Sequence, residues 1–281
     1  MFGFVRLTSQ GFGTVLGAAL IYTLGAIALF VVLKPAKLST YPKRYLAVSG
    51  GLFVFYEAAI SLSIGLAASS AQTVELSMVN YLWPTLTVLL ASLSSGGVRG
   101  VLRAVPGAAV ATVGVMLAVG GDAGIDVQVI AADVASNPLP FALTLAAAIA
   151  WACYSVLTPK VASGKDATAY FMAGVAVVFW AIFLTTGAPV PAIVPEAPSF
   201  AALAAAAASI AAGYALWNHG IVFGRMGVMA IASYAAPFLS AVASSIILGI
   251  SLPTLFWVGV ACVVAGSVLN LVFAALARRK A

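Results

Sequence analysis

Charged residues are scarce in this sequence. Only 7% of the 281 residues are Asp, Glu, Lys or Arg, and 63% are hydrophobic. A soluble domain carries about 25% charged residues, so this composition cannot supply a soluble surface. We therefore expect an integral membrane protein whose main partner is the lipid bilayer. The formal net charge of +6 does not indicate nucleic acid binding, because Lys and Arg in membrane proteins mark the cytoplasmic ends of helices.

Histidine and cysteine are also nearly absent. The chain has one histidine, and its two cysteines, Cys153 and Cys262, each lie inside an apolar run. We expect these cysteines to be small buried hydrophobic residues and not a disulfide or a metal pair. A metal enzyme needs a ligand cluster such as H-E-x-x-H, and a serine enzyme needs a serine with an oriented base. The sequence offers neither, so we expect no enzyme activity, no cofactor and no metal.

Long apolar runs are what the sequence has in abundance. A helix needs about 20 apolar residues to cross the hydrocarbon core of a bilayer. Nine segments satisfy this requirement, at 11–33, 44–67, 73–95, 102–121, 138–159, 167–187, 199–223, 227–249 and 253–277. The expected fold class is thus an all-α polytopic membrane protein with nine visible transmembrane helices.

Basic residues concentrate in alternate loops, where Asp166 is the only acidic residue. The loops after spans one, three, five, seven and nine contain Lys34, Lys37, Lys43, Arg44, Arg99, Arg103, Lys160, Lys165, Arg225, Arg278, Arg279 and Lys280. The loops on the opposite side contain Asp122, Asp126, Asp133 and Glu196. Because positive charge accumulates in cytoplasmic loops, this pattern predicts a cytoplasmic C-terminus and an external 122–137 segment.

The two halves of the chain carry similar motifs. Span three contains Tyr81-Leu82-Trp83-Pro84, and span eight contains Tyr234-Ala235-Ala236-Pro237. Spans two and seven also match, since each has a tyrosine, Tyr56 or Tyr214, followed by a polar cluster and a glycine. Spans three and eight cross in opposite directions, so the sequence predicts inverted repeats, the plan of many secondary transporters.

The repeat predicts a further helix at the start of the chain. The second half begins with two helices, whereas the first half shows one. Residues 1–9 resemble the end of span five, so we expect them to be the last turns of a helix whose body is trimmed, mis-assigned at the start codon or absent. The expected division is 1–121 for the first repeat, 122–137 for a periplasmic linker, 138–277 for the second repeat and 278–281 for a cytoplasmic tail.

Several strings resemble a known family. They are "GGLFVFYEAAISLSIGLA", "VELSMVNYLWPTLTVLL", "GVMLAVGGDAG", "AIAWACYSVLTPK" and "GYALWNHGI". The chain resembles the drug/metabolite transporter superfamily, of the EamA type, and within it the YddG-type aromatic amino acid exporters of bacterial inner membranes. This resemblance implies ten helices in two inverted five-helix halves, and an amino acid as the small-molecule substrate.

Two prolines mark the middle of their spans. Pro84 has no N–H and so leaves the carbonyl of Asn80 without its helical partner, and Pro237 does the same to Ser233. Inside a membrane a freed carbonyl is tolerated where protein, water or a ligand satisfies it. We expect Pro84 and Pro237 to be hinges beside a transport site, with Asn80 in that site.

Aromatic residues with polar tips lie well inside the spans. Their O–H and N–H groups need partners that hydrocarbon cannot supply, so some of them are expected to line a substrate cavity. The candidate substrate-binding residues are Trp83, Tyr81, Tyr56, Trp151, Tyr154, Tyr214, Trp217, Tyr234 and Tyr22. Trp257, Tyr41 and Tyr45 are expected to be interfacial anchors instead.

Three ionisable residues are candidates for a proton or polar role. Glu57 is in mid-span, Glu75 is near the outer end of span three, and His219 is near the inner end of span seven. A charge at the bilayer centre costs at least about 2.5 kcal/mol, so Glu57 is either a structural hydrogen-bond partner or a proton or substrate site. We expect a structural role for His219.

Two transport functions remain open from the sequence. The first is export of neutral amino acids by alternating access, which the aromatic residues and the lack of mid-membrane Lys or Arg favour. The second is efflux of aromatic organic cations coupled to protons through Glu57. The small residues Gly107, Ala111 and Gly114 are expected to let helices pack closely and slide. Energy coupling and oligomeric state are left open.

Overall fold

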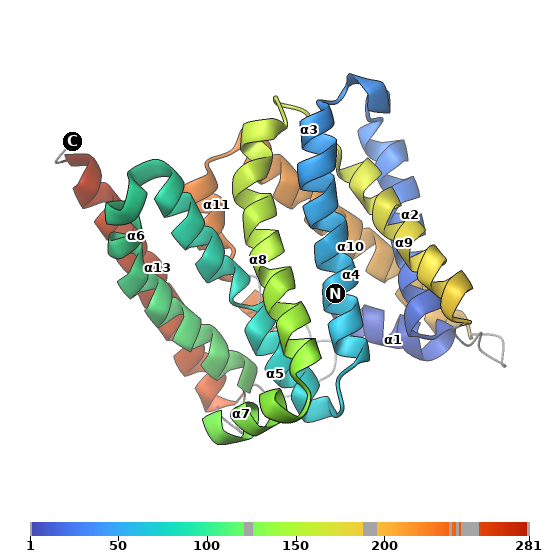
Figure 1. Ribbon diagram of the computed structural model, residues 1–281, viewed down its shortest axis with the longest axis horizontal. Coiled ribbons are helices and arrows are strands. Elements are labelled where there is room, and N and C mark those ends of the chain that lie inside the picture. The colour runs from blue at the N-terminus through green and yellow to red at the C-terminus, as the bar shows by residue number, and fades with distance from the viewer. Residues whose placement is uncertain are drawn as a thin grey trace. The chain divides into compact units, whose positions relative to one another are not determined.

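The computed structural model describes residues 2–120, 126–187, 196–235, 238–239, 242 and 253–279, and every regular element in these ranges is a helix. Figure 1 shows the helices, whose bounds follow. They are α1 (Phe2–Phe12), α2 (Thr14–Leu33), η1 (Leu38–Thr40), α3 (Lys43–Tyr45), η2 (Leu46–Gly50), α4 (Gly51–Gly65), α5 (Ser70–Asn80), α6 (Trp83–Gly120), α7 (Val127–Ser136), α8 (Pro138–Val161), α9 (Thr168–Thr186), α10 (Ala197–Phe223), α11 (Met226–Ala232) and α13 (Thr254–Arg279).

Six helical stretches in the described chain are long and apolar enough to cross a membrane. They are Thr14–Leu33, Lys43–Gly65, Glu75–Gly120, Pro138–Val161, Thr168–Thr186 and Ala197–Phe223, and Thr254–Asn270 is a shorter apolar helix. The third stretch holds two of the expected spans, because Gly97 adopts a non-helical conformation with φ 58° and α6 turns back on itself there (Figure 1). An all-helical membrane protein is confirmed, whereas the number of nine spans stays a prediction.

Two expected segments differ in how much of them the structure describes. Residues 2–12 form α1, as expected for the first residues of the chain, and Gly13 with φ 81° separates this helix from α2. Much of the expected span 227–249 lies outside the described residues, and so does its hinge residue Pro237. The hinge role of Pro237 therefore stays a prediction.

The helices group into two compact units. Unit 1 consists of residues 1–58 and 157–224, and unit 2 consists of residues 59–156 and 225–281. These units do not coincide with the two sequence halves, because each unit contains helices from before and after the 122–137 segment. Helices α4 and α8 each contribute residues to both units.

Unit 1 is built around α2. This helix packs against α9 and α10, and α1 also packs against α10. The inward-facing positions of α2 carry small or apolar residues, and one of them is Gly25. A Cβ added to Gly25 would lie 2.6 Å from the Met172 side chain and 3.5 Å from the Ala207 carbonyl. Lipid offers no hydrophobic driving force between membrane helices, so their association depends on close van der Waals packing of this kind.

Unit 2 is dominated by the contact between α6 and α13. Two glycines of α6 face two glycines of α13 in antiparallel order. A Cβ on Gly107 would lie 2.6 Å from the Gly266 carbonyl oxygen, and a Cβ on Gly114 would lie 2.5 Å from the Gly259 carbonyl oxygen. The same clash occurs from the other side, at 2.4 Å for both Gly259 and Gly266. The expected close packing at Gly107 and Gly114 is confirmed; sliding is not tested.

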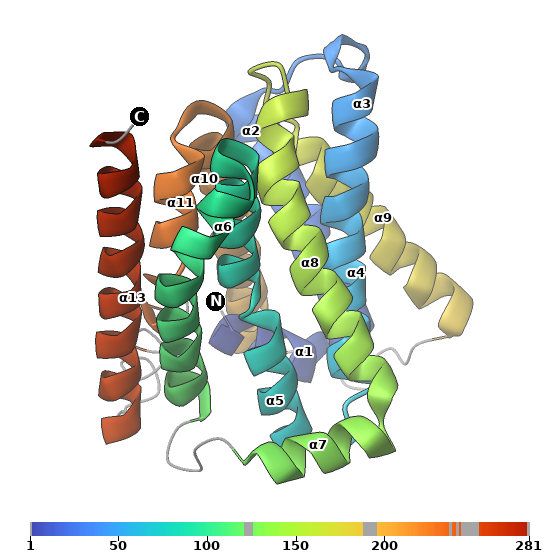
Figure 2. The same ribbon diagram turned by 60° about the vertical axis from the view of Figure 1, so that its left-hand side comes forward.

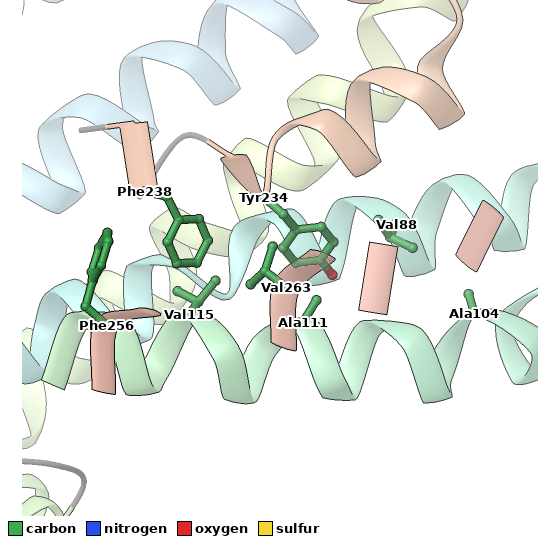
Figure 3. Packing of buried hydrophobic residues seen from close by; sticks show 8 residues of the cluster. All are labelled: Val88, Ala104, Ala111, Val115, Tyr234, Phe238, Phe256 and Val263. Carbon is green, nitrogen blue, oxygen red and sulfur yellow. The ribbon is translucent and has the colours of Figure 1, made fainter. Parts of the chain in front are cut away.

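A buried hydrophobic cluster fills the space beside this glycine contact. Figure 3 shows Tyr234 between Phe238 and Val88 in this cluster, which also contains Ala104, Ala111, Val115, Phe256 and Val263. Tyr81 packs against it from α5's end. The cluster thus joins the two motifs, Tyr81-x-x-Pro84 and Tyr234-x-x-Pro237, that the sequence comparison of the halves singled out.

Candidate functional site

The first helix break lies where the sequence places Pro84. Helix α5 ends at Asn80, Tyr81 and Leu82 form a turn, and α6 begins at Trp83. The Tyr81 amide donates to the Ser77 carbonyl at 3.0 Å, and the Leu82 amide donates to the Val79 carbonyl at 3.1 Å. Because Pro84 has no N–H, the Asn80 carbonyl receives no helical bond from position 84. We call residues Asn80–Leu82 the α5/α6 break.

The Asn80 side chain adds a second acceptor at this break. Its Oδ1 atom is buried and has no hydrogen-bond partner in the described part of the chain. Buried polar atoms are nearly always paired, so an unpaired one indicates a ligand, a water or a functional role. The role of Asn80 in a transport site stays a prediction.

A matching break occurs in the second half. Helix α11 ends at Ala232, and Ser233 and Tyr234 form a turn in which the Tyr234 amide donates to the Ile231 carbonyl at 3.2 Å. Tyr234 is fully buried. Its hydroxyl lies 3.0 Å from Thr85 Oγ1, which is also hydrogen-bonded to Thr112. Hydroxyl groups thus connect the two breaks inside unit 2.

Three of the predicted aromatic residues form a continuous row in unit 2. Trp83 meets Trp151 edge to face, with ring centroids 6.3 Å apart, and Trp151 stacks on Tyr154 at 5.0 Å. We call Trp83, Trp151 and Tyr154 the aromatic row. Trp83 is 9% exposed and Tyr154 is fully buried, so the row runs from the α5/α6 break into the interior of the unit.

Three other predicted residues form a separate cluster in unit 1. Both carboxylate oxygens of Glu57 accept hydrogen bonds, one from the Tyr22 hydroxyl and one from the Tyr214 hydroxyl. Glu57 is only 3% exposed, and Tyr22 stacks on Phe179 with centroids 5.5 Å apart. The cluster of Glu57, Tyr22 and Tyr214 therefore joins α2, α4 and α10. Tyr56 and Trp217, on α4 and α10, are half-buried.

The two remaining ionisable candidates lie elsewhere. Glu75 on α5 is 7% exposed, its Oε2 has no hydrogen-bond partner among the described residues, and Asp133 of α7 lies beside its carboxyl group. Helix α7 packs on α5 at one end of unit 2 (Figure 2). His219 is exposed on α10, with its ring 4.8 Å from that of Phe223. Among the residues that the structure describes, none beside His219 indicates a ligand.

The expectation that Tyr41 and Tyr45 are interfacial anchors is wrong. Both are buried, at 6% and 0% exposure, and both bind the loop between α8 and α9. The Tyr41 hydroxyl donates to the Asp166 carbonyl at 3.0 Å, and the Tyr45 hydroxyl accepts from the Ala167 amide at 3.1 Å. Burial is also the main cause that raises the pKa of Tyr41. Trp257, by contrast, is 56% exposed, as expected for a residue that faces lipid or its interface.

Asn218, which was not among the predicted site residues, binds the loop between α8 and α9. Its side-chain amide donates to Asp166 Oδ1 at 2.7 Å, and the same oxygen accepts from the amide and hydroxyl of Thr168 at 2.8 and 2.7 Å. The only available signal was an isolated amide in the string "YALWNHG". Within the described ranges, no three His, Cys, Asp or Glu side chains are close enough to hold a metal ion.

Known proteins resemble this chain over nearly its whole length. Residues 139–272 match the EamA-like transporter family. The aromatic amino acid exporters YddG of Salmonella typhimurium and Escherichia coli are 38% and 37% identical to this chain over 269 residues, which cover 96% of this chain and 91% of each relative. One solved protein crystal structure has a TM-score of 0.73 at 21% identity and covers 97% of this chain and 96% of its own, which supports the fold.

These similarities decide between a transporter and a membrane enzyme. The relatives are exporters, which confirms the expectation of a transporter instead of an enzyme. The chain therefore belongs to the EamA-like transporters of the drug/metabolite transporter superfamily, among the relatives of YddG.

Proposed function

We propose that this protein exports neutral amino acids, with Phe, Tyr and Trp among them, across a bacterial inner membrane. The observation that carries the proposal is the α5/α6 break, where two acceptor oxygens of Asn80 directly precede Trp83, the first member of the aromatic row. The exporters to which the chain is 38% and 37% identical carry aromatic amino acids in their names, and this supports the choice of substrate.

The chemistry of the site suits a neutral aromatic ligand. Ring faces and edges of Trp83 and Trp151 offer stacking and edge-to-face contacts, which add about 0.5–1.5 kcal/mol beyond the burial of area. The acceptor oxygens supply a small number of fixed polar contacts, as ligand pockets typically do. A phosphate-bearing substrate would need basic residues, and the Lys and Arg residues lie between the predicted spans instead.

The proposed mechanism is alternating access in a chain of two inverted repeats, 1–121 and 138–277, with the 122–137 linker outside and the C-terminus in the cytoplasm. In this proposal the two five-helix halves rock about a cavity in the middle of the membrane, with Pro84 and Pro237 as the flexible points.

Proton-coupled efflux of organic cations through Glu57 has less support. An organic cation would have to reach the Glu57 carboxylate, but this side chain is 3% exposed and is enclosed by the two tyrosines whose hydroxyls donate to it. The arrangement fits a structural role better, because the two tyrosine hydroxyls offset the cost of burying the carboxylate.

Transport by the purified protein tests the proposal. Proteoliposomes loaded with unlabelled amino acid should take up labelled Phe by counterflow, and Tyr and Trp should compete with it. Nucleotide-sugars and quaternary ammonium compounds should not compete. Counterflow of a quaternary ammonium compound without counterflow of any amino acid would overturn the proposal in favour of cation efflux.

A further inference from the structure

We infer that the C-terminal end of α5 binds the α-ammonium group of the substrate, through the side-chain oxygen and the main-chain carbonyl of Asn80. This inference rests on the proposed function and adds the polar half of substrate recognition to its aromatic half. Its basis is the set of buried side-chain atoms in unit 2 that have no hydrogen-bond partner among the described residues.

The unpaired atoms on α5 are all acceptors. In the described part of the chain, the buried side-chain atoms without partners are Asn80 Oδ1 and Glu75 Oε2 on α5, and both amide atoms of Asn270 on α13. Because Pro84 has no N–H, the main-chain carbonyl of Asn80 also lacks its usual helical donor and is a further acceptor at this end of α5. The unpaired groups on α5 are therefore acceptors, and a ligand that forms hydrogen bonds with them must supply N–H or O–H groups.

The electrostatics of the helix end favour a cation. Carbonyl groups at the C-terminus of a helix carry a partial negative charge equivalent to about −0.5 elementary charge. In transporters, the C-terminal ends of broken membrane helices bind cations for this reason. Glu75 lies five residues before Asn80, roughly 7.5 Å along the helix axis, and its carboxyl group is a second side-chain acceptor on the same helix.

The chain neighbours of Asn80 fit a zwitterion with an aromatic side chain. Trp83 is three residues away, across the turn, and begins the aromatic row. An ammonium group supplies three N–H donors and can satisfy both Asn80 oxygens at once. A water molecule could satisfy the same two oxygens, so the experiment must separate a water from an ammonium group.

The experiment compares ligands that differ in one charged group. Purified protein in proteoliposomes is assayed for counterflow of labelled Phe, with β-phenylethylamine, which lacks the carboxylate, and 3-phenylpropionate, which lacks the ammonium group, as inhibitors. The variants are Asn80→Leu, which removes the side-chain acceptor, and Asn80→Asp, which adds a negative charge. Ser77→Ala is the control on the same helix, because the Ser77 hydroxyl donates to the Thr73 carbonyl of its own helix at 2.9 Å.

Asn80→Leu should weaken the binding of Phe and of β-phenylethylamine by about tenfold or more, because it removes a hydrogen bond to a charged group. The same substitution should leave inhibition by 3-phenylpropionate unchanged. Asn80→Asp should strengthen inhibition by the amine and weaken inhibition by the acid, an opposite pair of shifts that a packing defect does not produce. Ser77→Ala should leave all three unchanged. If either Asn80 variant shifts the amine and the acid equally, or shifts neither, the inference is wrong. Absence of Phe counterflow in the unmutated protein would instead contradict the proposed function.

Discussion

The Tyr234 hydroxyl lies 3.0 Å from Thr85 Oγ1, and this contact joins two helix breaks that are 149 residues apart in the chain. Thr85 lies in the first turn of α6, three residues after the α5/α6 break, and Tyr234 is part of the turn that ends α11 in the second break. Thr85 Oγ1 is hydrogen-bonded to both Thr112 and the fully buried Tyr234, so these hydroxyl groups link the first turn of α6 to the end of α11.

This contact predicts a measurable coupling. Tyr234→Phe and Thr85→Val should each lower the free energy of unfolding by about 1 kcal/mol, because each removes one partner of a buried hydrogen bond. The double variant should cost clearly less than the sum of the two. Thermal unfolding in detergent measures the three values, and Thr73→Val, at an exposed position whose hydroxyl bonds its own helix, is the control. Additive effects would show that the two breaks are independent.

The aromatic row predicts a second result. Trp83→Leu should reduce counterflow of Phe about three- to tenfold, since it removes an edge-to-face and stacking partner worth about 0.5–1.5 kcal/mol. Trp83→Phe should retain most of the activity because it keeps an aromatic ring near Trp151. Tyr81→Leu tests the other residue of the motif, which packs against the hydrophobic cluster and should therefore affect expression more than affinity. Normal transport by both Leu variants at normal expression would remove these residues from the site.

The Glu57 cluster predicts a difference between polar and apolar substitutions. Glu57→Gln can still accept one tyrosine hydroxyl and donate to the other, so the protein should fold and transport Phe at a reduced rate with its pH dependence intact. Glu57→Leu leaves two buried phenols without their acceptor, at about 1–3 kcal/mol each, and expression should fall. Expression and counterflow at several pH values measure both effects. Loss of pH-driven transport in well-folded Glu57→Gln would restore the proton-coupled alternative.

The glycine contact between α6 and α13 predicts a strong effect of one methyl group. Gly114→Ala places a Cβ 2.5 Å from the Gly259 carbonyl oxygen, so the helices must separate and the free energy of unfolding should fall by about 1–3 kcal/mol. Gly51→Ala is the matched control, because no described atom lies within 4 Å of a Cβ there. Equal melting temperatures for the two variants in detergent would contradict the observed packing.

The charge pattern predicts the orientation in the membrane. In a variant without Cys153 and Cys262, a cysteine at the exposed position Ala131 of α7 should react with an impermeant thiol reagent added to intact cells from the periplasmic side. A cysteine at the exposed position Ser163, in the loop after α8, should react only after the membrane is opened. The reverse labelling would invert the proposed topology.

Local signals predicted more of this protein than its tertiary contacts. The helix bounds follow from apolar length, and the break after Asn80 follows from the missing N–H of Pro84, a property of a single residue. The partners of Glu57 could not be predicted, because Tyr22 and Tyr214 lie 35 and 157 residues away on other helices. Tyr45 was misjudged for the same reason: its position near a helix end is typical of an anchor, and only the fold places the Ala167 amide beside its hydroxyl.

The glycine pairs of α6 and α13 also have a consequence for leakage. At Gly107 and Gly114 the two backbones are so close that an added methyl group does not fit between them. A water molecule needs at least as much space, so it does not fit there either. Water therefore cannot pass between the two backbones at these two contacts, and a route for substrate or protons does not cross from one side of the α6–α13 contact to the other at Gly107 or Gly114.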